Sequence, residues 1–177
     1  MEKNLRDKLL PFSLALAVIL ADQITKALVV ANIPLYTIGW SFAGDFLRIV
    51  HVANKGVAFS LGSTLSQAFR GILFGLAPLA VIILVIAVYF RNNDFSALQR
   101  WCVCGIVGGG IGNIIDRIFR SEGVVDFVDV KFYGLFGLER WPTFNVADMA
   151  IVVCGILFIL TFITSAKGAA SKESAND

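Results

Sequence analysis

The feature that most constrains this chain is the stretch 71–90, a run of 20 residues without a single charged side chain. A helix needs about 20 apolar residues to cross the hydrocarbon core of a bilayer, so this run is long enough to span a membrane. The segments 9–31, 98–118 and 148–166 are of similar length and mostly apolar. The sequence therefore predicts a membrane protein with four transmembrane helices.

The composition supports this class and excludes others. Of the 177 residues, 57% are hydrophobic and only 16% are charged, against about 25% charged residues in an average soluble domain. So few charges cannot cover the surface of a soluble globule, and a disordered chain would lack this much apolar bulk. The net charge of +2 provides no broad basic surface, so we expect no nucleic-acid partner.

Sites based on cysteine, histidine or a catalytic serine find little support. Cys102, Cys104 and Cys154 lie in apolar stretches without the spacing of metal ligands, so we expect small buried side chains and no bound metal. Neither the G-x-S-x-G pattern of serine hydrolases nor the H-E-x-x-H pattern of zinc proteases occurs. The single histidine, His51, lies in a strand-like segment, where a packing or surface role is the simpler interpretation.

The distribution of lysine and arginine indicates how the chain crosses the membrane. Seven of these residues fall in the short segments 1–8, 91–100 and 167–177, and another seven are spread over 31–70 and 117–147. Because cytoplasmic loops carry the higher density of basic residues, we expect both termini in the cytoplasm. The first apolar run lacks a convincing cleavage site, so we interpret it as a retained helix and not as a signal peptide.

Two polar segments, about 34–66 and 118–147, lie between the helices on the predicted outer side. Residues 46–52 alternate between apolar and polar side chains, and residues 124–130 are rich in β-branched residues. Both patterns favour strands, so we expect a small extracytoplasmic sheet. The tail from about residue 168 is polar and predicted to be disordered.

Ionisable residues inside membrane helices are costly and by default mark a site. Asp22 and Lys26 are four residues apart on one face of the first helix, so they form either a structural ion pair or part of a polar cavity near the outer leaflet. Asn113, Asp116 and Arg117 share one face at the end of the third helix, where they either fix the bundle or hold a site. Glycines spaced by four in that helix let another helix approach closely.

Further acids follow the third helix and open the fourth. Asp148, close to Asn145, either caps the last helix or belongs to a site, and Asp126 and Asp129 are either solvated loop acids or site residues. The acids and amides that we expect at one membrane face are Asp22, Asp116, Asp126, Asp148, Asn54, Asn113 and Asn145. Two carboxylates held close together cannot both ionise cheaply, and such a pair can deprotonate water while it polarises a carbonyl.

Five short motifs follow one another along the chain. They are Asp22-Gln23-x-x-Lys26, Asn54-x-Gly56-Val57-Ala58-Phe59, Gly112-Asn113-x-x-Asp116-Arg117, Val124-Val125-Asp126-Phe127 and Phe144-Asn145-x-Ala147-Asp148. In this order the set resembles the lipoprotein signal peptidases, the type II bacterial signal peptidases. The resemblance implies a membrane aspartyl endopeptidase without metal or cofactor. Such an enzyme removes signal peptides from prolipoproteins by cutting before a cysteine that carries diacylglycerol.

The resemblance also implies roles for individual residues. Asp126 and Asp148 would be the catalytic pair. Asp116, which we expect to act as a partner of Arg117, is the rival for the first of these roles. Substrate binding and support of the pair would come from Asn54, Asn113, Asp116, Arg117, Asn145, Asp22 and Lys26.

The implied fold is an all-α membrane bundle of four transmembrane helices, with a small extracytoplasmic β-sheet that cradles the substrate and a short surface helix near 63–70. Residues 1–177 would form one peptidase domain. The enzyme would be a monomer in the bacterial cytoplasmic membrane, with its active site near the outer face and with lipid-modified prolipoproteins and the bilayer as partners. The segment 127–147 is somewhat longer than in the family, so its conformation stays open.

Two other kinds of function remain open at this stage. A small carrier could use Asp22, Lys26 and Asp116 as a relay, but it would need ionisable residues near the bilayer midplane and short loops. Here the acids cluster at helix ends and the outer segments are long. A structural membrane subunit would not require so many aspartate and asparagine residues on one side.

Overall fold

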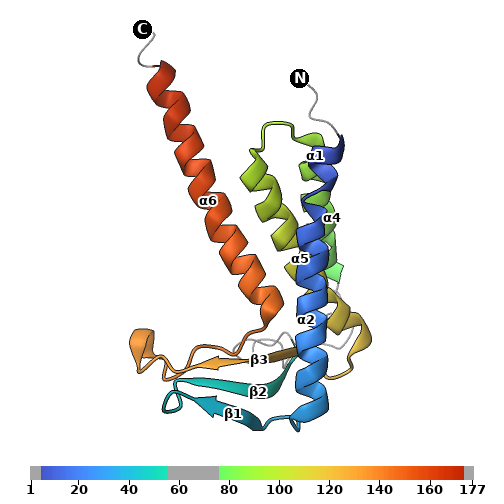
Figure 1. Ribbon diagram of the computed structural model, residues 1–177, viewed down its shortest axis with the longest axis vertical. Coiled ribbons are helices and arrows are strands. Elements are labelled where there is room, and N and C mark those ends of the chain that lie inside the picture. The colour runs from blue at the N-terminus through green and yellow to red at the C-terminus, as the bar shows by residue number, and fades with distance from the viewer. Residues whose placement is uncertain (1–4, 56–75, 174–177) are drawn as a thin grey trace.

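The computed structural model describes residues 5–55 and 76–173 as apolar helices that stand on a small sheet (Figure 1). The helices are α1 (Leu5–Leu9), α2 (Phe12–Asn32), α4 (Ala77–Arg91), α5 (Ala97–Phe119) and α6 (Val146–Glu173). The strands are β1 (Ile38–Phe42), β2 (Leu47–Asn54) and β3 (Val124–Val130), and a short 3-10 helix, η3 (Leu135–Gly137), follows β3. The sheet lies at one end of the bundle and both termini lie at the other (Figure 1).

In the described part of the chain, the helical segments that are long and apolar enough to cross a membrane are Leu5–Asn32, Ala97–Phe119 and Val146–Thr164. The described part of α4 is shorter, with 15 residues, and residues 71–75 of the predicted second span lie outside the described residues. Several apolar helices and a small antiparallel sheet therefore confirm the predicted class of membrane fold.

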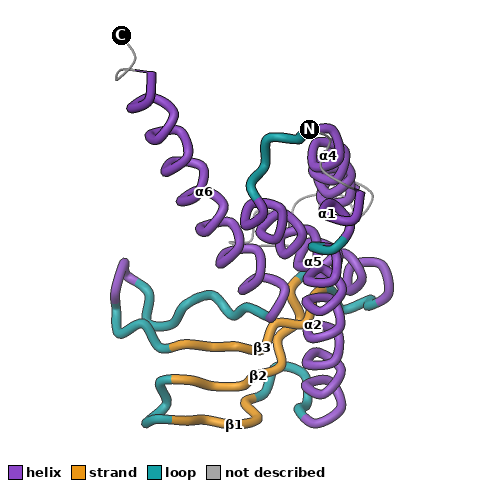
Figure 2. Tube along the Cα trace, turned by 45° about the horizontal axis from the view of Figure 1, so that its top comes forward, coloured by secondary structure: helices purple, strands orange, loops and turns teal. Residues whose placement is uncertain are grey.

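The last helix is longer than expected. It runs to Glu173, whereas its segment that is apolar enough to cross a membrane is Val146–Thr164, close to the predicted span 148–166. The segment 166–173 contains three alanines, two lysines and a glutamate, all good helix formers that prolong a helix beyond its apolar part. Away from the sheet, α6 diverges from the other helices (Figures 1 and 2).

The central helix is α5, which packs against α2, α4 and α6. Ser96 caps its start through a capping box with Gln99. A Cβ atom at Gly108 would lie 2.7 Å from the carbonyl oxygen of Ala15 in α2, so a larger residue there would force the two helices apart. On the same helix Cys104 is fully buried in the apolar core, as expected for a small apolar side chain.

The sheet is antiparallel with the strand order β1-β2-β3. Strands β2 and β3 confirm the two strands expected from the sequence, whereas β1 was not predicted. His51 in β2 is buried and its Nδ1 lies 2.7 Å from the carbonyl oxygen of Ile33, which confirms its packing role. The surface helix expected near 63–70 lies outside the described residues.

A cluster of charges closes the far end of the sheet. Arg140, from the segment between β3 and α6, pairs with Asp129 of β3 at 2.6 Å. Arg48 of β2 pairs with Asp45, and its guanidinium lowers the pKa of the Asp45 carboxyl to about 2. Asp129 is therefore a buried structural acid, and the alternative of a solvated loop residue is wrong for it.

Candidate active site

Two acids from different elements are joined by one asparagine residue. Asp126 lies in the middle of β3 and Asp148 lies in the first turn of α6. The side-chain amide of Asn145 donates a hydrogen bond of 2.6 Å to Oδ1 of Asp126, and its backbone N–H donates one of 3.2 Å to Oδ2 of Asp148. Side chains 22 residues apart in sequence thus share one polar site.

Local sequence explains how Asn145 reaches both acids. Asn145 precedes α6, and its Oδ1 accepts a hydrogen bond of 3.0 Å from the backbone N–H of Asp148. The two residues therefore form a reciprocal cap at the start of the helix, which leaves the Asn145 amide nitrogen free to point towards β3. Helix capping and site formation were alternatives in the sequence, and the structure combines them.

The second oxygen of each acid has its own donor. Asn54, at the end of β2, donates a hydrogen bond of 2.9 Å to Oδ2 of Asp126, since the antiparallel register places it beside β3. Asn113 of α5 donates one of 2.8 Å to Oδ1 of Asp148. All three predicted asparagines thus contact the two acids.

Burial perturbs the first acid of the pair. Asp126 is 2% exposed, and this desolvation raises its pKa to about 6. The hydrogen bonds from Asn54 and Asn145 lower the pKa and the negative charge of Asp148 raises it, but burial has the largest effect. The effect of Asp148 indicates that the two carboxylates lie within electrostatic range of each other.

A buried cluster of charged residues lies next to this pair of acids. Asp22, Lys26 and Asp116 are each 0% exposed. The ammonium group of Lys26 lies 2.8 Å from Oδ2 of Asp22 and 3.0 Å from Oδ2 of Asp116, and it donates a hydrogen bond of 2.9 Å to Oδ1 of Asn113. Because Lys26 is only a donor, it makes Oδ1 of Asn113 the acceptor and turns the Asn113 amide nitrogen towards Asp148.

Each acid of this cluster also holds the backbone next to one acid of the site. Oδ1 of Asp22 accepts a hydrogen bond of 3.0 Å from the N–H of Ala147, the residue before Asp148. Oδ2 of Asp116 accepts one of 3.0 Å from the N–H of Val125, the residue before Asp126. The ion pair between Asp22 and Lys26 is therefore structural, and it also orients the site.

The surroundings of Asp116 differ in one respect from the expectation. Its ion-pair partners in the described chain are Lys26 and Arg120, the latter at 3.0 Å, and not Arg117 as expected. Arg117 is only partly buried and lies within electrostatic range of Asp148, Asp126 and Asp116. Arg120 was missed by the sequence reasoning, although its spacing of four residues from Asp116 is a signal for such a pair.

Gln23 was also missed as a site residue. Its side-chain amide donates hydrogen bonds to Oδ2 of Asp22 at 3.1 Å and to Oδ1 of Asp116 at 3.2 Å. Within residues 5–55 and 76–173, no group of three or more histidine, cysteine, aspartate or glutamate side chains is arranged to hold a metal ion. The polar side chains of the site in the described part of the chain are therefore carboxylates, amides, a lysine and arginines.

The family model that matches this chain describes aspartic peptidases, and the apolar helices fit a membrane protein. Within this class the chain belongs to the signal peptidase II family, whose model, "Signal peptidase (SPase) II", matches residues 14–164. The family suggested by the sequence motifs is thereby confirmed.

Two relatives and two solved structures illustrate the match. The lipoprotein signal peptidase of Treponema pallidum (strain Nichols) is 49% identical over 172 residues, which cover 97% of this chain and 92% of the relative. That of Treponema denticola is 48% identical over 153 residues, 86% and 88% of the two chains.

The solved structures are two chains described as bacterial membrane enzymes studied by the in meso method. Their TM-scores are 0.71 and 0.74 at 24% and 23% identity. The first match covers 86% of this chain and 91% of the other, and the second covers 89% and 90%. They support the fold of this chain.

Proposed function

We propose that this aspartic peptidase removes signal peptides from diacylglyceryl-modified bacterial prolipoproteins, and that Asp126 and Asp148 activate the hydrolytic water. Cleavage would fall immediately before the lipid-carrying cysteine. The observation that carries the proposal is the bridge through Asn145, which joins the two acids of β3 and α6 in one polar site. The matched relatives carry the name lipoprotein signal peptidase, which supports this substrate class.

The proposed chemistry uses one proton shared by the pair. Asp148 is ionised and takes a proton from water, while Asp126 is protonated and donates a hydrogen bond to the scissile carbonyl. Water attacks the carbonyl carbon, and the tetrahedral intermediate collapses as a proton passes to the leaving amine. The raised pKa of Asp126, about 6, suits the protonated partner.

The remaining site residues have positioning roles in this proposal. Asn54, Asn113 and Asn145 fix the orientation of the two carboxyl groups through the hydrogen bonds described above. Asp22, Lys26 and Asp116 hold the backbone beside them. Asp116 is a weaker candidate for catalysis than Asp126, since Lys26, Arg120 and the Val125 N–H already occupy its oxygens.

Arg117 is the cation left for the substrate in this scheme. It is partly exposed and within range of both acids, so its guanidinium can bind the substrate backbone near the cut. Asp22, Lys26 and Asp116 are bound to one another in ion pairs. These pairs argue against a carrier that would use the three residues as a proton relay.

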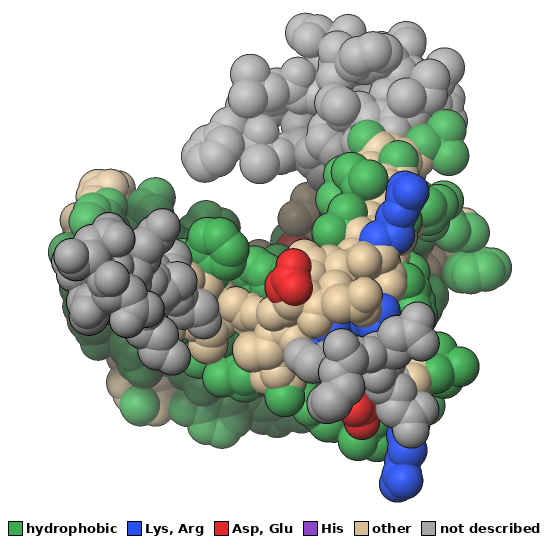
Figure 3. Space-filling view, turned by 90° about the horizontal axis from the view of Figure 1, so that it is seen from above, with side chains coloured by type: hydrophobic (Ala, Val, Ile, Leu, Met, Phe, Trp, Pro, Cys, Tyr) green, Lys and Arg blue, Asp and Glu red, His purple; other side chains and the backbone are tan. Residues whose placement is uncertain are grey.

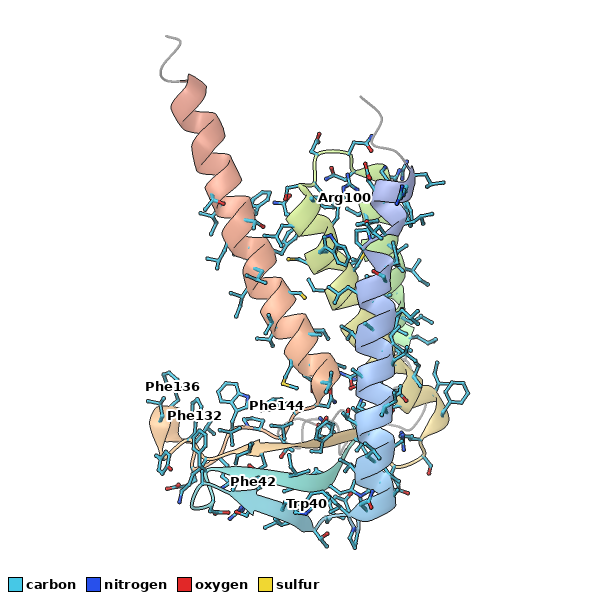
Figure 4. All side chains as sticks on the ribbon, in the orientation of Figure 1. Trp40, Phe42, Arg100, Phe132, Phe136 and Phe144 are labelled. Atoms are coloured by element: carbon cyan, nitrogen blue, oxygen red, sulfur yellow. The ribbon has the colours of Figure 1, made fainter. Side chains whose placement is uncertain are left out.

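The proposed placement has four spanning helices, with α4 in the span predicted for 71–90, in one domain that acts as a monomer. Both termini face the cytoplasm and the site lies near the outer surface, where the substrate lipid stays in the leaflet and water can enter. The sheet would cradle the substrate at this surface. Exposed aromatic side chains on and near the sheet, including Trp40, Phe42 and Phe136, suit the membrane–water boundary (Figure 4).

The test is cleavage of a prolipoprotein, with and without diacylglycerol on its cysteine, by the full chain in proteoliposomes. We expect cleavage of the modified form only, and a loss of about 100-fold to 10,000-fold in Asp126→Asn and Asp148→Asn. Asp129→Asn, an aspartate of the same strand outside the site, is the matched control: it loses its ion pair with Arg140 and some stability, but the folded variant should retain activity. Near-normal turnover in either site variant, or an active Asp126→Asn beside an inactive Asp116→Asn, would contradict the proposal.

A further inference from the structure

The end of the bundle opposite the sheet contains a second buried charge, Arg100. It lies in the first turn of α5 and is 2% exposed. Its Nη2 donates long hydrogen bonds to the carbonyl oxygens of Asn92 and Asn93, at 3.4 and 3.3 Å. Its guanidinium carbon lies 5.6 Å from the ring centre of Tyr89. Figure 4 shows Arg100 at the end where both termini lie, far from the sheet.

Most of the hydrogen-bonding capacity of this guanidinium is unused. Nε and Nη1 are buried and have no hydrogen-bond partner among the residues that the structure describes. Burying a cation without acceptors is costly, and a cation near the positive end of a helix dipole is less favourable still. Arg100 therefore lies where an anion would be stabilised twice, by the unpartnered Nε and Nη1 of the guanidinium and by the start of a 23-residue helix.

A cavity of about 190 Å³ opens against this residue. Its lining combines one arginine, one aspartate and several apolar residues. The lining residues are Asp7, Leu10, Pro11, Ala97, Arg100 and Trp101. Asp7 is exposed, so its carboxylate stands at the rim while Arg100 stands inside. Figure 3 looks onto this end of the molecule, where a few acidic and basic side chains stand among apolar ones.

We propose that this cavity binds a phosphoethanolamine group, with the phosphate on Arg100 and the amine on Asp7. Arginine N–H groups bind phosphate oxygens well, and a phosphate beside Arg100 would supply acceptors for Nε and Nη1, the two buried nitrogens that lack a partner among the described residues. The rim acid makes a zwitterion a better ligand than a purely anionic group. A phospholipid headgroup and soluble phosphoethanolamine share this chemistry. The lipid source rests on the proposed membrane placement, which puts the cavity at the boundary opposite the active site.

The experiment measures binding to the delipidated full chain in detergent, by native mass spectrometry and by the rise in unfolding temperature. The probes are phosphatidylethanolamine, phosphatidylglycerol, diacylglycerol and soluble phosphoethanolamine. Arg100→Met keeps the length of the side chain and removes the guanidinium, and Arg100→Lys keeps the charge. Arg91→Met removes an exposed cation from the same end of the bundle and is the matched control.

We expect phosphatidylethanolamine to bind and stabilise the wild type more strongly than diacylglycerol, which lacks the phosphate. Arg100→Met should weaken this binding about tenfold or more, the loss expected for a charge-assisted hydrogen bond, while Arg91→Met should not. Asp7→Asn should shift the preference towards phosphatidylglycerol. Comparable binding of soluble phosphoethanolamine would support the phosphate site and overturn the lipid source.

Binding that is equal in wild type and Arg100→Met, or equal for phosphatidylethanolamine and diacylglycerol in wild type, overturns the proposal. The second comparison needs no variant, so it decides the matter even if Arg100→Met does not fold. Because the measurement is lipid binding, its failure would leave the proposed peptidase activity untouched.

Discussion

Replacing Lys26 with methionine tests the buried charge cluster most severely. Methionine keeps the length of the side chain but leaves the carboxylates of Asp22 and Asp116 without their shared cation, from which they lie 2.8 and 3.0 Å. Removal of one partner of a buried ion pair costs about 3–5 kcal/mol, because a charge is left buried and uncompensated. For a chain of this size that corresponds to a fall in unfolding temperature of roughly 6–20 °C.

The assay is thermal unfolding of the purified full chain in one detergent, with Lys55→Met as control. Lys55 pairs with Glu122 at 3.4 Å, but both side chains are more than half exposed, so its loss should cost less than about 1 kcal/mol. Adding Asp22→Asn to Lys26→Met removes one of the stranded charges and should restore part of the stability. The reasoning is refuted if Lys26→Met unfolds at the same temperature as Lys55→Met, or if the second substitution makes the loss larger.

Three other predictions concern the site and its frame. The pKa of Asp126 is raised from 3.8 to about 6, so the stability that this group contributes is complete below pH about 4 and is lost as pH rises through about 6. The loss amounts to about 3 kcal/mol, and Asp126→Asn should remove this part of the pH dependence of unfolding. Asn145→Ala should cost about 1–2 kcal/mol through the lost helix cap, and should lower the hydrolysis rate at least about 100-fold because Asp126 loses the amide that orients it; a normal rate would argue against the bridge. Gly108→Ala should destabilise the fold by about 1–3 kcal/mol, since its Cβ would meet the backbone of Ala15, whereas Gly155→Ala, whose Cβ meets no atom within 4 Å, should not.

Much of the fold could be predicted because its signals are local. Apolar runs located the helices, and alternation and β-branched residues located β2 and β3. Strand β1 was missed since all five of its residues are exposed, so its side chains show no pattern of burial. Its turn to β2 contains Gly44 and Asp45, both ordinary turn residues with positive φ, so a turn signal was present in the sequence and was not used.

The candidate site was predictable as a set of residues but not as an arrangement. The spacing of Asp22 and Lys26 predicted their ion pair, which the structure contains. The contact of Lys26 with Asn113 crosses from α2 to α5, and it decides which end of the Asn113 amide faces Asp148. Such a choice depends on tertiary packing, so no local pattern could reveal it.

The most direct test of the central claim is a single-turnover measurement on Asp126→Asn and Asp148→Asn with a lipid-modified prolipoprotein, together with the affinity of each variant for that substrate. If the two acids carry the chemistry, the rate of bond cleavage falls about 100-fold to 10,000-fold in each variant while the affinity changes less than about threefold. A rate within about tenfold of the wild type in either variant, at unchanged affinity, would contradict the assignment of the catalytic pair.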